Sequence, residues 1–180
     1  VVHYAGVAVD MDRINEIAKQ YNLYVIEDAA QALMSEYKGK KLGTFGEFGT
    51  ISFHETKNII SGEGGAIIIN DKNFINRSEI IREKGTNRSQ FYRGKVDKYT
   101  WVDIGSSYLP SEIIAAFLKA QLINAEEITK QRKDIWNKYH IAFDNLEKKE
   151  LLTRPHIPDY AKHNAHMYFI VLNDSKKRDN

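Results

Sequence analysis

Residues 51–65 read I-S-F-H-E-T-K-N-I-I-S-G-E-G-G and join two apolar segments through a polar turn and a glycine-rich break. Residues 51–53 predict a strand, and residues 66–69 predict the next one. Between them lies one lysine, Lys57. An amine just beyond a buried strand can lose water, and desolvation favours its neutral, nucleophilic form. A lone loop lysine is more often simply solvated, so the surrounding residues must distinguish the two interpretations.

The residues before this stretch predict a helix followed by a strand with an acidic end. Asp10 is a good N-cap for a helix that closes near Asn22. The apolar run at residues 23–26 has the length of a buried strand and leads directly into Glu27 and Asp28. This alternation is typical of an α/β sheet covered on both faces. Ligands of such sheets bind at the carboxyl ends of the strands, where Asp28 is expected.

The residues after it predict three parts of a chain that reads as a fragment. Helical spacing occurs at residues 74–84 and again from Ser111 to about residue 146, whereas residues 86–107 are polar, basic and aromatic without a period. Two prolines near residue 156 mark a linker before an apolar strand at residues 167–172. We therefore expect part of a large domain at residues 1–109, a long connecting helix at 110–148, and the start of a small C-terminal α/β domain at 149–180.

The composition excludes several classes of protein. With 42% apolar and 28% charged residues the chain is ordinary for a globular protein, and a formal net charge of +2 gives no electrostatic case for nucleic acid or membrane as a partner. The absence of cysteine excludes thiolate chemistry and fits a reducing compartment, so we expect a cytoplasmic location. The histidines lack the spacing of a metal site, and we expect no metal.

Four polar side chains at predicted strand ends suit a pyridoxal phosphate site. They are a carboxylate, an amide, a hydroxyl and an amine, carried by Asp28, Gln31, Ser52 and Lys57. In such sites a lysine binds the cofactor covalently, a carboxylate keeps the pyridine nitrogen protonated, and a hydroxyl helps to hold the phosphate. An acidic residue after a strand is also a common helix cap. Spacing alone therefore leaves the site and the structural interpretation open.

Three competing interpretations are weaker or unresolved. A phosphate-binding loop at residues 62–65 would need a helix behind its glycines, and a strand is predicted there instead, which favours a turn. The basic and aromatic residues 88–101 could bind nucleic acid, could hold a nucleotide-linked substrate, or could form a solvated loop whose aromatic side chains pack into the core. A hydrolase that uses Ser52 and Lys57 lacks the Gly-x-Ser-x-Gly turn of such enzymes.

Three motifs together resemble the sugar aminotransferase family of fold type I pyridoxal phosphate enzymes, which aminate nucleotide-linked keto-sugars. The motifs are V-I-E-D-A-A-Q at residues 25–31, G-T-I-S-F-H-E-T-K-N at 49–58 and G-E-G-G at 62–65. The resemblance implies a three-layer α/β fold with a mostly parallel seven-stranded sheet and a homodimer with sites at its interface. It implies that Lys57 binds the cofactor and moves the proton, and that the pyridine nitrogen, ring hydroxyl, phosphate and ring face meet Asp28, Gln31, Ser52 and Ala30, respectively.

Further segments resemble those family members that aminate a dTDP-linked 4-keto-6-deoxy sugar with glutamate as amino donor, in cell-surface polysaccharide biosynthesis. These segments are residues 54–58, 82–90, 96–101, 103–111 and 164–167. Another nucleotide-sugar aminotransferase, such as a 3-keto enzyme, and a catalytically silent binding relative are the alternatives. Dehydratase relatives replace the lysine by histidine, which Lys57 argues against. Residues 105–108 depart from the family motif that reaches the partner subunit's phosphate, so that role is left unassigned.

Overall fold

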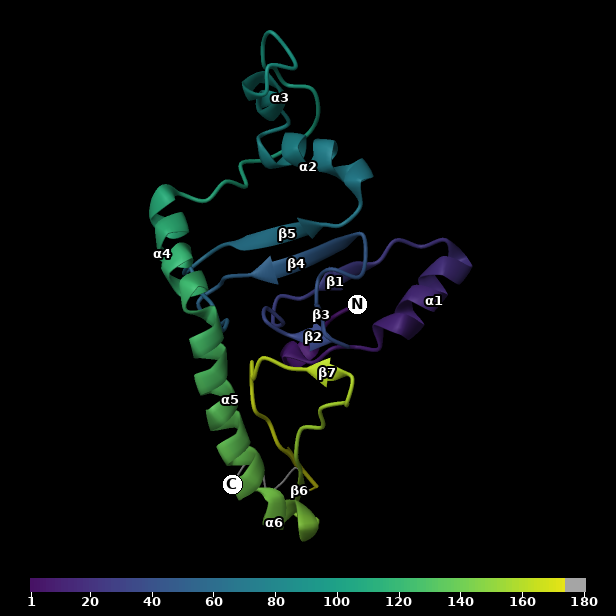
Figure 1. The fold of residues 1–180 in the computed structure, drawn as a ribbon, viewed down its shortest axis with the longest axis vertical. Helices are drawn as coiled ribbons and strands as arrows, with labels where there is room; N and C mark the ends of the chain where they lie inside the picture. Colours follow the sequence, from purple (N-terminus) through teal and green to yellow (C-terminus); the bar gives the residue numbers. More distant parts are fainter. Residues whose placement is uncertain (174–180) are drawn as a thin grey trace.

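The computed structural model describes residues 1–173, and the expected end of the C-terminal domain at 174–180 lies outside the described residues. Its central sheet has three strands in the order β1 (Ile26–Asp28), β4 (Phe48–Ser52) and β5 (Gly65–Ile69) (Figure 1). β1 and β4 run parallel, with Asp28 opposite Thr50, whereas β4 and β5 run antiparallel. The α/β class predicted from the sequence is confirmed, and β5 lies close to its predicted position.

The predicted N-terminal helix forms α1 (Met11–Tyr21), and its ends are those expected from the sequence. The Asp10 side chain accepts a hydrogen bond from the Arg13 backbone N–H, which satisfies one of the free donors of the first turn. Asn22 closes the helix with a left-handed φ of 52°. The following strand starts at Ile26 rather than at residue 23, because the Val25 N–H bonds to the Glu47 side chain instead of a neighbouring strand.

A second, smaller sheet joins distant parts of the chain. It has the order β3 (Lys40–Lys41), β2 (Glu36–Tyr37) and β7 (Ala161–Lys162). β7 belongs to the predicted C-terminal part and pairs antiparallel with β2 of the predicted large domain. A two-stranded sheet of β6 (Leu152–Thr153) and β8 (Val171–Leu172) follows near the end of the described residues.

The single connecting helix expected at 110–148 is three helices: α4 (Glu112–Ile123), α5 (Ala125–Ala142) and α6 (Asp144–Lys148). Ser111 caps α4, and α4 and α5 continue one another along one side of the molecule (Figure 1). The first break falls at Asn124, whose side chain donates to the Ala120 carbonyl. Asparagine competes in this way with the helical backbone pattern, which sequence periodicity alone does not reveal.

The polar, basic segment after β5 forms a projection of its own. It follows the short helices η2 (Lys72–Phe74) and α2 (Ile75–Arg82) and contains α3 (Arg88–Tyr92), which lies beyond α2 and away from the central sheet (Figure 1). Arg93 forms a two-pronged ion pair with Glu79 that fastens α3 to α2. Trp101 is 77% exposed. The aromatic side chains of this segment are therefore exposed and do not pack into the core, which the solvated-loop interpretation required.

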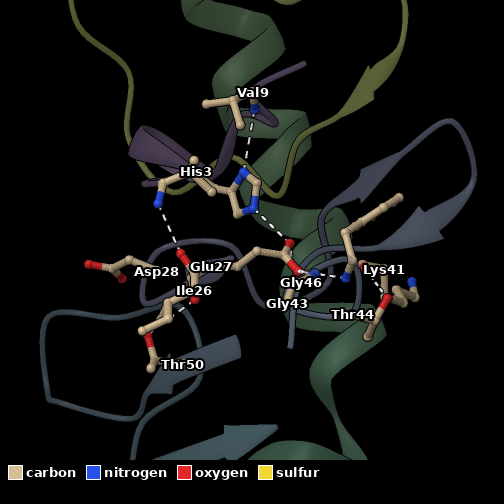
Figure 2. Close-up of polar contacts among 12 residues, drawn as sticks. His3, Val9, Ile26, Glu27, Asp28, Lys41, Gly43, Thr44, Gly46 and Thr50 are labelled. Carbon is tan, nitrogen blue, oxygen red and sulfur yellow. Dashed lines mark hydrogen bonds and ion pairs between the residues drawn. The ribbon is translucent and has the colours of Figure 1, made fainter. Parts of the chain in front are cut away.

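Glu27 is the most deeply embedded charged residue of the central sheet. It lies in the middle of β1 and is fully buried. Its two oxygens accept four hydrogen bonds of 2.6 to 2.9 Å, from the Nε2 of His3 and the backbone N–H groups of Gly43, Phe45 and Gly46 (Figure 2). Burial opposes ionisation, but these hydrogen bonds together hold the pKa of Glu27 below its usual value.

His3 connects this carboxylate to the start of the chain. Its Nδ1 accepts from the Val9 backbone N–H at 3.3 Å, so Nε2 carries the proton that is donated to Glu27 (Figure 2). The backbone of the same segment pairs with β1, since His3 N–H donates to the Asp28 carbonyl and Asp28 N–H donates to the Val1 carbonyl. This segment forms an isolated parallel bridge from Val2 to Asp28 and then the turn η1 (Tyr4–Gly6).

The core of the C-terminal part is an aromatic cluster around Trp136 of α5. The Trp136 indole N–H donates to the Met167 carbonyl, and its ring stacks on His140 and meets the edge of His163, each at a centroid distance of 4.6 Å. Burial here, followed by the positive charge of Lys133, lowers the pKa of His163 to about 4. His163 is therefore neutral in the folded protein at physiological pH.

Replacing Glu27 by Gln in the full-length protein is expected to lower the free energy of unfolding by about 3 kcal/mol at pH 7, because an amide NH2 would face backbone donors that it cannot accept from. The lowered pKa makes the Glu27 contribution complete above its unfolded value of about 4.3 and lost as pH falls through the folded value. Urea denaturation at pH 7 and pH 3.5 measures this, with the exposed Glu16→Gln as control. A loss equal to that of the control would contradict the assigned role.

His163→Gln is expected to remove part of the acid sensitivity of the fold. The neutral form is favoured in the folded state, so the contribution of His163 is complete above about pH 6.5 and is lost as pH falls toward 4. With allowance for solvent screening, about 1–2 kcal/mol of the stability difference between pH 7 and pH 5 should disappear. Denaturation curves of the full-length protein at both pH values test this, with the exposed His156→Gln as control. An unchanged pH dependence would contradict it.

Candidate functional site

The carboxyl ends of the parallel strands β1 and β4 place Asp28 and Ser52 at the same edge of the central sheet. The two strand ends are held together by a backbone hydrogen bond, which the Ala29 N–H donates to the Thr50 carbonyl at 3.0 Å. Asp28 is exposed, and its Oδ1 accepts from the Ala30 backbone N–H at 3.0 Å. This is the local bond of a cap, and it leaves the outer oxygen of Asp28 free to accept from a ligand.

Gln31 and Ala30 form the turn that follows β1, and both are half-buried. The Gln31 Oε1 accepts from the Ala5 backbone N–H at 2.6 Å, so its carboxamide orientation is set by the N-terminal turn. The amide nitrogen of Gln31 is then the end available as a donor, which is the chemistry required beside a phenolic oxygen.

Lys57 lies in the loop between β4 and β5, as the sequence predicted, and it is half-buried. Its backbone N–H donates to the His54 carbonyl at 3.0 Å, while the Ser52 Oγ accepts from the His54 N–H at 3.3 Å. Gly62 and Gly64 have φ values of 85° and 134°, and β5 follows them directly. The glycines therefore supply the positive φ of a turn, as favoured from the sequence, rather than the start of a helix.

Three residues that the sequence reasoning did not select support this edge from a distance. They are Asn58, Asn164 and His166. Asn58 donates through Nδ2 to the Asn164 carbonyl at 2.8 Å, and its Oδ1 lies 3.0 Å from the Nδ1 of His166. The position of Asn58 directly after Lys57 was a signal, as was the inclusion of residues 164–167 among the resembling segments.

Asn164 holds the turn after β1 against the C-terminal segment. It is 1% exposed, and its Nδ2 donates to the carbonyls of Gln31 and Leu33, both at 2.8 Å. Its Oδ1 is buried without a hydrogen-bond partner among the described residues and faces Gly6, where an added Cβ would lie 2.0 Å away. The packing at Gly6 therefore requires a residue without a side chain.

His166 is half-buried beside the lysine loop. Desolvation, followed by the positive charges of Lys57 and Arg132, lowers its pKa. The Arg132 guanidinium donates to the carbonyls of Ala165 and His166, which fixes the backbone of this segment against α5. The imidazole is thus a neutral group held close to the lysine loop.

The edge has a donor and acceptor set compatible with pyridoxal phosphate. An exposed carboxylate, a half-buried hydroxyl, an amide donor and a half-buried lysine come from the ends of β1 and β4 and the loop that follows β4. The basic and aromatic residues 88–101 lie in the projection formed by α3 and are not gathered at this edge (Figure 1). Within residues 1–173, no group of three or more metal-ligating side chains occurs, and no helix is both long and apolar enough to cross a bilayer.

The fold is that of an aminotransferase. It superposes on Helicobacter pylori PseC, an aminotransferase involved in the biosynthesis of pseudoaminic acid, with a TM-score of 0.86 and 28% identity, over 98% of this chain and 46% of that one. The chain belongs to the DegT/DnrJ/EryC1/StrS aminotransferase family, whose model matches residues 1–180. The family predicted from the sequence is confirmed, and its members are pyridoxal phosphate-dependent.

Curated relatives extend the comparison to named enzymes. The UDP-4-amino-4,6-dideoxy-N-acetyl-beta-L-altrosamine transaminase of Campylobacter jejuni serotype O:23/36 is 34% identical over 96% of this chain and 44% of its own length. The GDP-perosamine synthase of Escherichia coli O157:H7 is 36% identical over 94% of this chain and 43% of its own length. The chain thus spans less than half the length of these relatives.

The packing of Asn164 on Gly6 can be tested by comparing Gly6→Ala with Gly39→Ala in the full-length protein. Both glycines have positive φ, at +75° and +82°, but nothing lies within 4 Å of a Cβ at Gly39. Gly39→Ala should therefore destabilise by about 1 kcal/mol, from backbone strain alone. Gly6→Ala should lower the free energy of unfolding by about 3 kcal/mol, because the new Cβ would displace the Asn164 side chain from its hydrogen bond to the Gln31 carbonyl. Pyridoxal phosphate binding should weaken about tenfold for the same reason. Equal effects in thermal denaturation and cofactor titration would contradict this.

Proposed function

We propose that the whole protein is a pyridoxal phosphate-dependent aminotransferase that aminates a nucleotide-linked keto-sugar. The observation that carries the proposal is the arrangement of Asp28 and Ser52 at adjoining ends of parallel strands, with Lys57 in the loop that follows. Family membership and the named relatives, which act on UDP- and GDP-linked sugars, support it.

In this proposal each side chain has one task. Pyridoxal phosphate, when bound, supplies an electrophilic aldehyde and a ring that accepts electrons. Asp28 would pair with the pyridine nitrogen, the amide of Gln31 with the ring hydroxyl, and Ser52 with the phosphate. Ala30 would lie against the ring, where a small side chain is needed. Lys57 would hold the cofactor covalently and would serve as the general acid and base of the site.

The specific activity that we propose is that of a dTDP-4-amino-4,6-dideoxygalactose transaminase. The substrate would be dTDP-4-keto-6-deoxyglucose and the amino donor glutamate, in the synthesis of enterobacterial common antigen or a similar surface polysaccharide. This rests on the resemblance of residues 82–90, 96–101 and 103–111 to those enzymes. A UDP- or GDP-linked substrate, as in the named relatives, and a 3-keto sugar are the alternatives within the family. A cytoplasmic location fits the absence of cysteine.

We also propose that the whole protein works as a homodimer. Large apolar side chains stay exposed on the segment that leads from α3 into α4, among them Trp101 at 77%, Ile104 at 86% and Ile113 at 82%. Large apolar side chains left exposed are a feature of interaction sites, which supports the proposal. In the proposed dimer the basic and aromatic residues 88–101 would be available to hold the nucleotide diphosphate of the substrate.

Lys57→Ala in the full-length protein should lower kcat by about 10³-fold or more, since no other group in the proposed site can bind the cofactor aldehyde. The visible absorbance of lysine-bound pyridoxal phosphate should disappear, and borohydride reduction should label a peptide containing Lys57 only in the wild type. The matched control is the exposed Lys40→Ala, which should keep absorbance and activity. Full activity in Lys57→Ala would refute the proposed mechanism.

The substrate assignment is tested separately with dTDP-, UDP- and GDP-linked 4-keto-6-deoxy sugars and with a 3-keto sugar, each with glutamate. The dTDP-linked 4-keto substrate should give the highest kcat/KM, and the product sugar should be identified by NMR. A higher kcat/KM for a UDP- or GDP-linked sugar would refute the dTDP assignment while leaving the aminotransferase proposal intact. A protein that binds pyridoxal phosphate but aminates none of them would favour the catalytically silent relative.

A further inference from the structure

The residue that follows Lys57 has both ends of its side chain engaged in a distant part of the chain. Asn58 is 9% exposed. Its Nδ2 donates to the Asn164 carbonyl, 106 residues further on, and its Oδ1 meets the Nδ1 of His166, 108 residues further on. A buried carboxamide that satisfies two groups of one segment holds that segment in a single register.

This contact determines which nitrogen of His166 carries the proton. Because Asn58 Nδ2 already donates to a carbonyl, the end that faces His166 is the acceptor oxygen. The Nδ1 of His166 must therefore carry a proton and donate it. In a neutral imidazole the other nitrogen, Nε2, is then an acceptor with a free lone pair.

The surroundings of His166 favour the neutral ring. The charged groups that act on it are Lys57 of the lysine loop and Arg132 of α5, and both are cations. A second proton on the imidazole would add a third positive charge to a partly buried place. The Arg132 guanidinium is engaged with the carbonyls of Ala165 and His166, so it fixes the backbone rather than the ring.

We propose that Asn58 is a positioning residue that holds His166 as the neutral Nδ1–H tautomer, so that Nε2 accepts a hydrogen bond from a hydroxyl or amine of the substrate bound at Lys57. The proposal rests on the proposed function for its substrate. A hydrogen-bond acceptor at this place selects ligands with a donor there and disfavours a carboxylate or phosphate oxygen. The hydroxyl groups of a sugar and the amino group of the donor both meet that requirement.

Nitrogen-15 NMR of the full-length holoenzyme with labelled histidine tests the tautomer directly, with His166 assigned from His166→Gln. In the wild type, His166 should show a protonated Nδ1 and an unprotonated Nε2 at pH 7.5. Asn58→Asp keeps an acceptor oxygen and should keep this tautomer. Asn58→Leu removes the acceptor and should shift the proton toward Nε2. The exposed Asn137→Leu on α5 is the control and should change neither.

Kinetics with a nucleotide keto-sugar provide the second measurement. Asn58→Leu should lose about tenfold or more in kcat/KM, the value of one hydrogen bond to the substrate, and Asn58→Asp should retain more activity than Asn58→Leu. A proton on Nε2 in the wild type, an unchanged tautomer in Asn58→Leu, or a kcat/KM within twofold of wild type would each overturn the proposal. If Asn58→Leu does not fold, the wild-type spectrum and Asn58→Asp decide.

The outcomes separate this proposal from the proposed function. A protein that aminates no keto-sugar but shows the Nδ1–H tautomer, lost in Asn58→Leu, refutes the function and supports the positioning role of Asn58. An active enzyme whose His166 carries its proton on Nε2 supports the function and overturns the positioning role.

Discussion

The burial of one carboxylate, Glu27, is the constraint on which the central sheet depends. Its four hydrogen bonds connect the middle of β1 to His3 near the start of the chain and to the turn that contains Gly43 and Gly46. Side chains alternate along a strand, so an inward Glu27 requires that Asp28 point to the other face. The glutamate thereby makes the aspartate available at the edge of the sheet. The turn accepts this only with glycine, since a Cβ at Gly46 would lie 2.3 Å from the Val25 carbonyl oxygen.

Local features of the fold were predictable because their causes are local. The Asp10 cap, the left-handed Asn22 and the apolar run in β5 each depend on residues within one turn of helix or one strand. The sequence could not show that Glu27 is the buried structural residue and Asp28 the exposed one. The backbone N–H groups that bind Glu27 lie 16 to 19 residues further on in the chain. The break between α4 and α5 at Asn124 was not predicted, because the helical spacing of apolar residues continues across it.

The residues proposed for the site could be selected from the sequence, whereas the residues that support them could not. Asp28, Gln31, Ser52 and Lys57 are recognisable by residue type and by their places at strand ends. Asn58, Asn164 and His166 are ordinary polar residues in sequence, and only their mutual contacts distinguish them. The support also crosses the expected division of the chain, because residues 161–166 pack on β2 and on the turn after β1. Residues from both sides of the expected domain boundary at residue 149 therefore contribute to the surroundings of the site.

The hydrogen bonds made by Asn164 have a consequence for folding during synthesis on the ribosome. Its partners lie 106 to 133 residues earlier in the chain, so these contacts close the longest loops in the site. A ribosome releases Lys57 and Asp28 well before it releases Asn164. The nascent chain therefore displays the lysine, the aspartate and the strand ends for many seconds before the segment that orders them emerges. Cofactor capture should accordingly be a late event of synthesis, and the earlier interval is when the chain is most open to chaperones.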